Sequence, residues 1–185
     1  SDDPRTITVS RMQKRYGVDL EQARRVETLA QSFWKRVDAR APDVPDALLS
    51  WAAAVHEIGM AIAHEDYHRH SAYVIAHSDI YGFSEQERDA LALLVLGHTG
   101  SLKKIDRNAL SRKALARLVC LRLAAIFCHG RVDEAPDAAL AMSGETFVLV
   151  VNANWLAERP LTTLLLEEET ARWQKYGVSF LLKTV

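Results

Sequence analysis

Apolar residues recur every three or four positions along the first two thirds of the chain, which is the period of an amphipathic helix. Helices are predicted over residues 6–16 and 19–39, with a break at Gly17 between them. Pro42 and Pro45 mark the turn that follows. The chain is therefore expected to begin with two helices joined by a short connection.

Four more helices are predicted from the same spacing. They cover about residues 46–63, 68–79, 84–98 and 108–128. Ser84 and Glu87 stand three apart, which is the capping-box pattern of a helix start, and Gly100 follows the end of that helix. Six helices with short connections predict an all-α bundle over residues 1–131.

The pattern changes after this bundle. Residues 132–137 are typical of a loop, and two short β-rich runs, ALAM and ETFVLVV, flank a Ser-Gly pair that suits a hairpin turn. A helix is predicted over residues 154–176, with an interruption at Pro160, and VSFLLKTV follows as a last strand. We therefore expect a mainly α protein, in which the helical bundle is followed by a small α/β domain of order β-β-α-β at residues 132–185.

The composition is that of a soluble globular protein, since hydrophobic residues make up 49% and charged residues 25% of the chain. The formal net charge of −1 gives no general basic field, so nucleic acid is not an expected partner. No signal-like segment opens the chain and no apolar run of about 18 residues occurs, so we expect a cytoplasmic protein without a membrane partner. Cys120 and Cys128 lie in one predicted helix, roughly 12 Å apart, and cannot pair with each other.

Five of the seven histidines lie between residues 55 and 79, which raises the question of a metal site. Metal sites need ligands that converge from different elements. The candidate ligands, from three predicted helices, are His56, Glu57, His70 and His98. A plainer interpretation places His56 in a helix contact with one nitrogen hydrogen-bonded and His70 at a helix start. His98 then lies at a helix end, where it either faces water or complements the C-terminal helix dipole. His68 is then expected either in a solvated loop or in a helix-cap role.

The clearest charge asymmetry lies between residues 103 and 122, where seven basic residues stand against one acidic residue. A groove of Lys and Arg side chains would bind a linear phosphate chain through the release of counterions. The candidate phosphate-binding residues are Lys103, Lys104 and Arg107, with a second cluster of Arg69, His68 and His70. The alternative is a solvated helix face, which is what a charge run usually forms. Arg117 and Arg122 do not share one side of the predicted helix, which weakens the case for a single patch. Glu167, Glu168 and Glu169, further along, are expected to face solvent or a basic surface of another subunit.

A series of short motifs follows a fixed order along residues 4–130. The motifs are RYGVDLEQARRV, HEIG, YHRHSAY, a short SD turn, GFS and LV-x-x-H. Together they resemble the C-terminal half of the exopolyphosphatase and guanosine pentaphosphate phosphatase (Ppx/GppA) family. The resemblance implies an HD-like fold for the helical bundle, and the change to β-rich sequence fits the family's small last domain.

The resemblance also implies that hydrolysis takes place elsewhere in a longer parent protein. Family members carry phosphate-binding loops, a catalytic carboxylate and magnesium in two N-terminal actin-like domains, and no Gly-rich phosphate loop of this kind is found here. We therefore expect no catalytic residue and no cofactor in this chain. Its expected role is to help bind inorganic polyphosphate or guanosine pentaphosphate, and to help form a homodimer.

Two other functions stay open. An autonomous HD-type, metal-dependent phosphohydrolase would use His56 and Glu57 as its dyad, but residues 19–39 contain no histidine, and Ala124 and Ala125 stand where an acid is expected. The third possibility is a nucleotide-sensing regulatory domain, for which the sequence offers no clear set of base-stacking residues.

Overall fold

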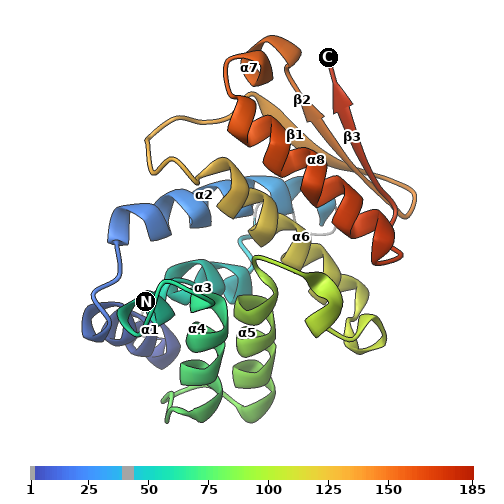
Figure 1. Cartoon of the computed structure of the whole chain (residues 1–185). Coiled ribbons are helices and arrows are strands. Elements are labelled where there is room, and N and C mark those ends of the chain that lie inside the picture. Colours follow the sequence, from blue (N-terminus) through green and yellow to red (C-terminus); the bar gives the residue numbers. More distant parts are fainter. Residues whose placement is uncertain (1–2, 39–43) are drawn as a thin grey trace.

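The computed structural model describes residues 3–38 and 44–185, so Pro42 of the predicted turn lies outside the described residues (Figure 1). The helical part contains α1 (Pro4–Arg15), α2 (Leu20–Val37), α3 (Ala47–Val55), η1 (Ile58–Ala61), α4 (Tyr67–His77), α5 (Glu85–Gly97), η2 (Leu102–Lys104), η3 (Arg107–Ala109) and α6 (Arg112–Phe127). The C-terminal part contains β1 (Ala138–Ser143), β2 (Thr146–Val151), α7 (Ala153–Ala157), α8 (Pro160–Lys175) and β3 (Phe180–Thr184). The mainly α class with a small β-β-α-β part is confirmed.

Many helices begin where the sequence supplies a capping side chain. The Asp19 carboxylate accepts a hydrogen bond from the backbone N–H of Gln22 at 3.1 Å, and Ser84 and Glu87 form the predicted capping box. Caps of this kind contribute about 0.5–2 kcal/mol each. Local chemistry therefore fixes the starts of α2 and α5.

The third predicted helix ends early, at Val55, and η1 follows it. The cause is a contact with α4: the Ser71 hydroxyl accepts a hydrogen bond from Gly59 N–H at 2.8 Å and donates one to the His56 carbonyl at 2.9 Å. A side chain at Gly59 would collide with α4, because its Cβ would lie 2.2 Å from the Tyr67 carbonyl oxygen. The apolar spacing continues across this break, so periodicity alone could not reveal it.

One apolar core joins the helical and the C-terminal parts. Helix α6 contacts both α2 and α8, while α4 and α5 lie side by side in the lower part of the view (Figure 1). Leu118 and Leu121 of α6 belong to the same buried cluster as Leu149 and Phe180 of the sheet. The division into two domains after residue 131 stays a prediction. No described helix is both long and apolar enough to cross a membrane.

The strands form one sheet in the order β1-β2-β3, antiparallel between β1 and β2 and parallel between β2 and β3. Helix α8 is the crossover of the parallel pair, and Leu149 and Phe180 pack on the helices from the inner face of the sheet. The register places Ala141, Val148 and Leu181 in one row on the outer face. Ala141 and Leu181 are exposed there and Val148 is half-buried, so this row is apolar, while Lys183 stands in the next row of the same face.

A buried ion pair between Arg122 of α6 and Glu169 of α8 connects the helical part to the C-terminal part. The Arg122 Nε and Nη2 atoms donate to the Glu169 carboxylate at 2.7 and 2.8 Å, and Trp173 Nε1 donates to the same carboxylate at 2.8 Å. Arg122 also donates to the carbonyls of Gly97 and Gly100 at 2.6 and 2.9 Å. The Arg122 and Glu169 side chains are only 2% and 1% exposed.

Two expectations from the sequence are wrong at this pair. Arg122 does not belong to an exposed basic face, and Glu169 does not face solvent, although Glu167 and Glu168 do. The reason is tertiary, because each of the two charges is buried against a partner 47 positions away in the chain. Charge pattern within one helix could not show this.

We expect Glu169→Ala to lower the free energy of unfolding by about 3–5 kcal/mol, because it leaves the Arg122 charge buried without its partner. Urea denaturation of the variant and the unchanged chain measures the difference. Glu168→Ala, at an exposed neighbouring position, should change it by less than about 0.5 kcal/mol. The double variant Arg122→Met/Glu169→Leu should recover part of the loss, since it buries no charge. Equal effects of the two alanine variants would contradict the role of the pair.

Candidate functional site

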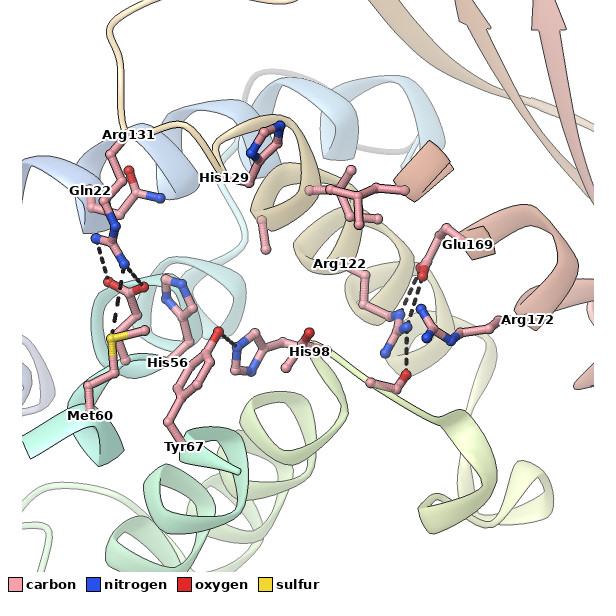
Figure 2. Close-up of a pocket in the computed structure, with 16 residues that line it drawn as sticks. Gln22, His56, Met60, Tyr67, His98, Arg122, His129, Arg131, Glu169 and Arg172 are labelled. Carbon is pink, nitrogen blue, oxygen red and sulfur yellow. Dashed lines mark hydrogen bonds and ion pairs between the residues drawn. The ribbon is translucent and has the colours of Figure 1, made fainter. Parts of the chain in front are cut away.

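A cavity of about 250 Å³ lies between the ends of α3 and α5 on one side and α6 and α8 on the other (Figure 2). Its buried floor is polar and consists of His56, Glu57, His98, Arg122 and Glu169. Its rim is exposed or half-buried and includes Tyr67, Arg131 and Arg172. A polar floor of this kind distinguishes the cavity from an apolar packing defect.

The two buried histidines are held by backbone carbonyls one helical turn earlier. His56 Nδ1 donates to the Ala53 carbonyl at 2.6 Å, and His98 Nδ1 donates to the Val95 carbonyl at 2.5 Å. Since a carbonyl only accepts, each ring carries its proton on Nδ1 and a lone pair on Nε2. The Tyr67 hydroxyl donates to His98 Nε2 at 2.9 Å.

The two imidazole rings meet edge to face, with centroids 4.9 Å apart and planes at 84°. Burial lowers the pKa of both rings, and the neighbouring His56 lowers the pKa of His98 further. Both rings are therefore neutral near pH 7. The plainer interpretation of His56 describes this arrangement, whereas the expectation that His98 faces water is wrong, because its side chain packs against His56 and is 1% exposed.

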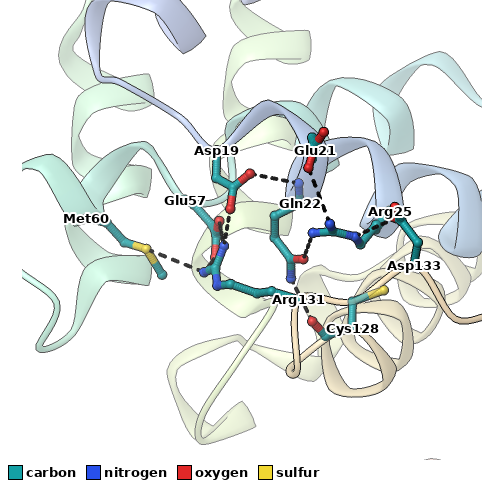
Figure 3. Close-up of polar contacts among 9 residues, drawn as sticks. All are labelled: Asp19, Glu21, Gln22, Arg25, Glu57, Met60, Cys128, Arg131 and Asp133. Atoms are coloured by element: carbon teal, nitrogen blue, oxygen red, sulfur yellow. Dashed lines mark hydrogen bonds and ion pairs between the residues drawn. The ribbon is translucent and has the colours of Figure 1, made fainter.

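Glu57, next to His56, pairs with Arg131 (Figure 3). The Arg131 Nη2 and Nη1 atoms lie 2.5 and 3.2 Å from the Glu57 carboxylate oxygens, and Nη1 also donates to Asp19 at 3.1 Å. The hydrogen bond to Glu57 is the largest cause of a raised pKa of Arg131. Arg131 has a φ of +55°, which costs a non-glycine residue about 1–3 kcal/mol. Its ion pairs hold the backbone in this conformation.

The candidate metal ligands are only partly brought together. Those that line the cavity are His56, Glu57 and His98, whereas His70 does not line it. Tyr67 occupies the Nε2 atom of one histidine, and Arg131 pairs with the glutamate. Ala125 lines the cavity where the HD-like resemblance requires an acid. In the part of the chain that the structure describes, no group of three or more His, Cys, Asp or Glu side chains is placed to hold a metal ion. These donors do not fit a metal centre.

The candidate phosphate-binding residues separate into two places. Lys103 and Arg107 are exposed on η2 and η3. Burial raises the pKa of Tyr176, and the charge of the nearby Arg107 opposes this effect in part. Lys104 is half-buried, and its Nζ atom donates to the Thr99 carbonyl at 2.6 Å. The exposed Lys103 and Arg107 and the half-buried Lys104 therefore have different surroundings.

The cations that act on Lys104 come from three other elements: Arg69 of α4, Arg122 of α6 and Arg172 of α8. Burial, and then these charges, lower the pKa of Lys104 to about 8. Glu169 neutralises Arg122, whereas Arg69 and Arg172 have no ion-pair partner among the described residues. We refer to Arg69, Lys104 and Arg172 as the basic cluster.

His68 lies beside the basic cluster and is buried, so the expectation of a solvated position is wrong. Its ring packs against Tyr67 and His98, with centroids 6.2 and 6.5 Å apart, because the start of α4 docks on the end of α5. Burial, followed by the charges of Lys104 and Arg69, lowers the pKa of His68 to about 4. His70 is half-buried, and its part in phosphate binding stays a prediction.

Sequence reasoning missed Arg172 and the Thr99–Gly100 segment. Gly100 has a φ of +78° and was assigned only to a helix end. Arg172 stands in a helix that gave no functional signal, and only the docking of α8 brings it to the cavity. Arg117, counted in the basic stretch, instead forms an ion pair with Asp46 at 2.8 Å.

Comparison with known proteins gives a family match over most of the chain. The family model described as "Ppx/GppA phosphatase, domain III" matches residues 5–170. A protein of Pseudoalteromonas translucida (strain TAC 125), named guanosine-5'-triphosphate,3'-diphosphate pyrophosphatase, is 31% identical over 186 aligned positions. The alignment covers 95% of this chain and 37% of that relative, so the chain spans little more than a third of the relative's length.

The neutral state of His68 in the folded protein predicts a pH dependence of stability. Its pKa is about 4 when folded and 6.5 when unfolded, so the unfolded chain binds more protons between these values. The contribution of His68 is complete above about pH 6.5 and is lost as the pH falls to about 4. We expect His68→Phe to reduce the fall in unfolding free energy between pH 7 and pH 4.5, as measured by urea denaturation.

The matched control is His77→Phe, at an exposed position of α4. It should leave the pH dependence unchanged. A His68→Phe variant with the same pH dependence as the unchanged chain would contradict the assignment of a neutral, buried ring.

Proposed function

This chain belongs to the Ppx/GppA phosphatase family, and from that premise we propose that it is a non-catalytic module that binds a chain of phosphates for hydrolysis elsewhere in a longer protein. The substrate of that protein is inorganic polyphosphate or guanosine pentaphosphate. The name of the relative, a pyrophosphatase acting on a guanosine polyphosphate, supports this substrate class. The terminal phosphoanhydride is cut in actin-like domains that carry magnesium, as the family resemblance implies.

The basic cluster is the observation that carries this proposal. The charges of Arg69 and Arg172, from two other elements, act on Lys104 together with the opposing charge of Asp66, and neither arginine forms an ion pair within the described residues. An ammonium has three donors, and the Thr99 carbonyl takes one from Lys104. Burial, and then the repulsion between Lys104 and these arginines, lowers the pKa of Lys104. A polyanion relieves the repulsion, so phosphate oxygens are a fitting ligand.

We expect the triple variant Arg69→Ala/Lys104→Ala/Arg172→Ala to bind medium-chain polyphosphate at least about tenfold more weakly. The slope of log K against log salt should fall by about 2, because each lost phosphate contact removes about 0.7. Isothermal titration calorimetry at several salt concentrations, with chelator present, measures both quantities.

The comparison variant is Lys103→Ala/Arg107→Ala/Lys113→Ala, which removes the same charge from exposed positions. Lys103 and Arg107 are also candidate phosphate-binding residues from the sequence. We expect their charges to attract polyphosphate toward the basic cluster but to contribute little to the affinity. An equal loss in the two triple variants would place binding on the exposed stretch instead.

We further propose that the module forms a homodimer through the outer face of its sheet. Ala141, Val148 and Leu181 form an apolar row there, and such open apolar faces are typical of interaction surfaces. Leu181→Glu should convert the dimer to a monomer in light scattering, because it places a charge in the contact. Leu20→Glu, at an exposed position of α2, should leave the mass unchanged. A monomeric unchanged chain would overturn the proposal.

An autonomous HD-type hydrolase is the alternative function. It has one observation in its favour, the meeting of His56 and His98 in a cavity. The pairing of Glu57 with Arg131 and the absence of an acid at Ala125 argue against it. We therefore assign no catalytic residue and no metal to this chain.

A further inference from the structure

A second hollow lies between α1 and the segment that joins α4 to α5, on the side of the molecule away from the sheet (Figure 1). It shares no lining residue with the cavity of Figure 2. Its volume is about 180 Å³, below the range of roughly 300–1,000 Å³ for sites that hold complete small molecules. The size therefore suits one side chain of a larger partner. We refer to this hollow as the α1 hollow.

The buried side chains that line the α1 hollow are mostly apolar. Met12 and Ile80 are only 8% and 7% exposed. The third buried lining residue, Thr8, already donates its hydroxyl hydrogen to the Tyr81 carbonyl at 2.6 Å. The hollow therefore suits an aliphatic or aromatic side chain, which gains free energy from leaving water and needs no hydrogen bond.

Tyr81 also lines the α1 hollow and is held ready for a partner. It is 74% exposed, the largest fraction among the exposed large apolar and aromatic residues in the described part of the chain. Its backbone, in contrast, is fixed on α1 by the hydrogen bond from Thr8, and a Cβ at the neighbouring Gly82 would lie 3.1 Å from the Pro4 Cβ. Tyrosine is enriched in protein interfaces, and a fixed backbone lowers the entropy that binding costs.

The charges beside the α1 hollow are mainly positive. Arg11 and Arg15 line it from successive turns of α1, and both are exposed, as is Lys14. None of the three forms an ion pair within residues 3–38 and 44–185. Cations in the last turn of a helix complement its dipole, which accounts for Lys14 and Arg15, but Arg11 lies one turn earlier. One acid, Asp79, lines the hollow, so the net charge of its lining favours an anionic partner.

A protein segment fits this arrangement better than a nucleic acid. A nucleic acid carries a phosphate at every nucleotide, so Asp79 would repel it, and its backbone offers no apolar side chain for the hollow. A peptide combines carboxylates for the arginines with an apolar side chain for the space beside Met12 and Ile80. Its backbone N–H groups can also donate to the Asp79 carboxylate.

We propose that the α1 hollow is a docking site for an acidic segment of a partner protein. One aliphatic or aromatic side chain of that segment enters the hollow, and neighbouring carboxylates bind Arg11 and Arg15. This inference goes beyond the proposed function, because the hollow is separate from the basic cluster. The module can therefore hold a phosphate chain and a partner protein together.

The test uses a fluorescein-labelled peptide of twelve residues, composed of Asp and Glu around one central phenylalanine. Fluorescence anisotropy measures its binding to the 185-residue chain. We expect this peptide to bind at least about tenfold more tightly than two matched peptides. One of them has Asn and Gln in place of the acids, and the other has serine in place of the phenylalanine. Added salt should weaken binding, because it screens contacts between exposed charges.

The double variant Arg11→Ala/Arg15→Ala should weaken binding of the acidic peptide at least about tenfold. The matched control is Lys35→Ala/Arg36→Ala, which removes the same charge from exposed positions of α2 and should leave the affinity unchanged. An equal loss in the two double variants would overturn the site, because it would show attraction to the general charge of the chain.

Two further variants separate the α1 hollow from other surfaces. Tyr81→Ala should weaken binding of the acidic peptide, whereas Tyr73→Ala, at an exposed position of α4, should not. The triple variant of the basic cluster, Arg69→Ala/Lys104→Ala/Arg172→Ala, should bind the peptide as the unchanged chain does. Loss of peptide binding in this triple variant would place the peptide on the basic cluster and overturn the proposal.

Three other results would also decide against the docking site. Equal affinities for the acidic and the uncharged peptide would exclude recognition of carboxylates. Equal affinities for the phenylalanine and the serine peptide would exclude an anchor side chain in the hollow. Tighter binding of a twelve-nucleotide oligothymidylate than of the acidic peptide, lost in Arg11→Ala/Arg15→Ala, would make the surface a nucleic-acid site instead.

Discussion

The buried ion pair of Arg122 and Glu169 is the contact on which the functional surfaces depend. Burying two charges is tolerated only when every donor and acceptor around them is satisfied, and here Trp173 and the Gly100 carbonyl complete the set. The pair fixes α8 on α6, and α8 carries Arg172 to the cavity. If the pair is removed, the cavity loses a wall and the basic cluster loses one of its cations. Stability and ligand binding are therefore set by the same contact.

A second buried carboxylate, Glu57, is neutralised in the same way, by Arg131 from the segment after α6. A guanidinium is always charged and has a fixed geometry, so it supplies at this position what a metal ion supplies in an HD-type centre. With both glutamates paired and both imidazoles neutral, the cavity floor has little net charge. Arg172, which forms no ion pair within the described residues, lies at the rim instead.

The sequence predicts those parts of the fold that depend on neighbouring residues. Helix positions follow from apolar spacing, and the starts of α2 and α5 follow from Asp19 and Ser84, because a cap acts within three residues. The break after α3 could not be predicted, since it depends on Ser71 from the next helix. The order of strands and helix along the C-terminal part was predictable from the change to alternating apolar residues.

For the candidate site, too, the sequence predicts only those features that depend on neighbouring residues. His56, Glu57 and Lys104 could be selected from the sequence, because their motif and charge are local features. What they do there depends on partners far along the chain, and the sequence does not show that Glu57 faces an arginine or that Lys104 faces α8.

The segment between α5 and α6 connects the cavity to the basic cluster. It starts at His98 in the cavity floor and reaches Lys104 in the basic cluster within a few residues. Its Thr99 and Gly100 carbonyls are held by Lys104 and Arg122, so its path is fixed from both ends. A phosphate that draws Lys104 away from Thr99 would therefore loosen the cavity wall. Phosphate binding at the basic cluster and order in the cavity wall are coupled through this one lysine.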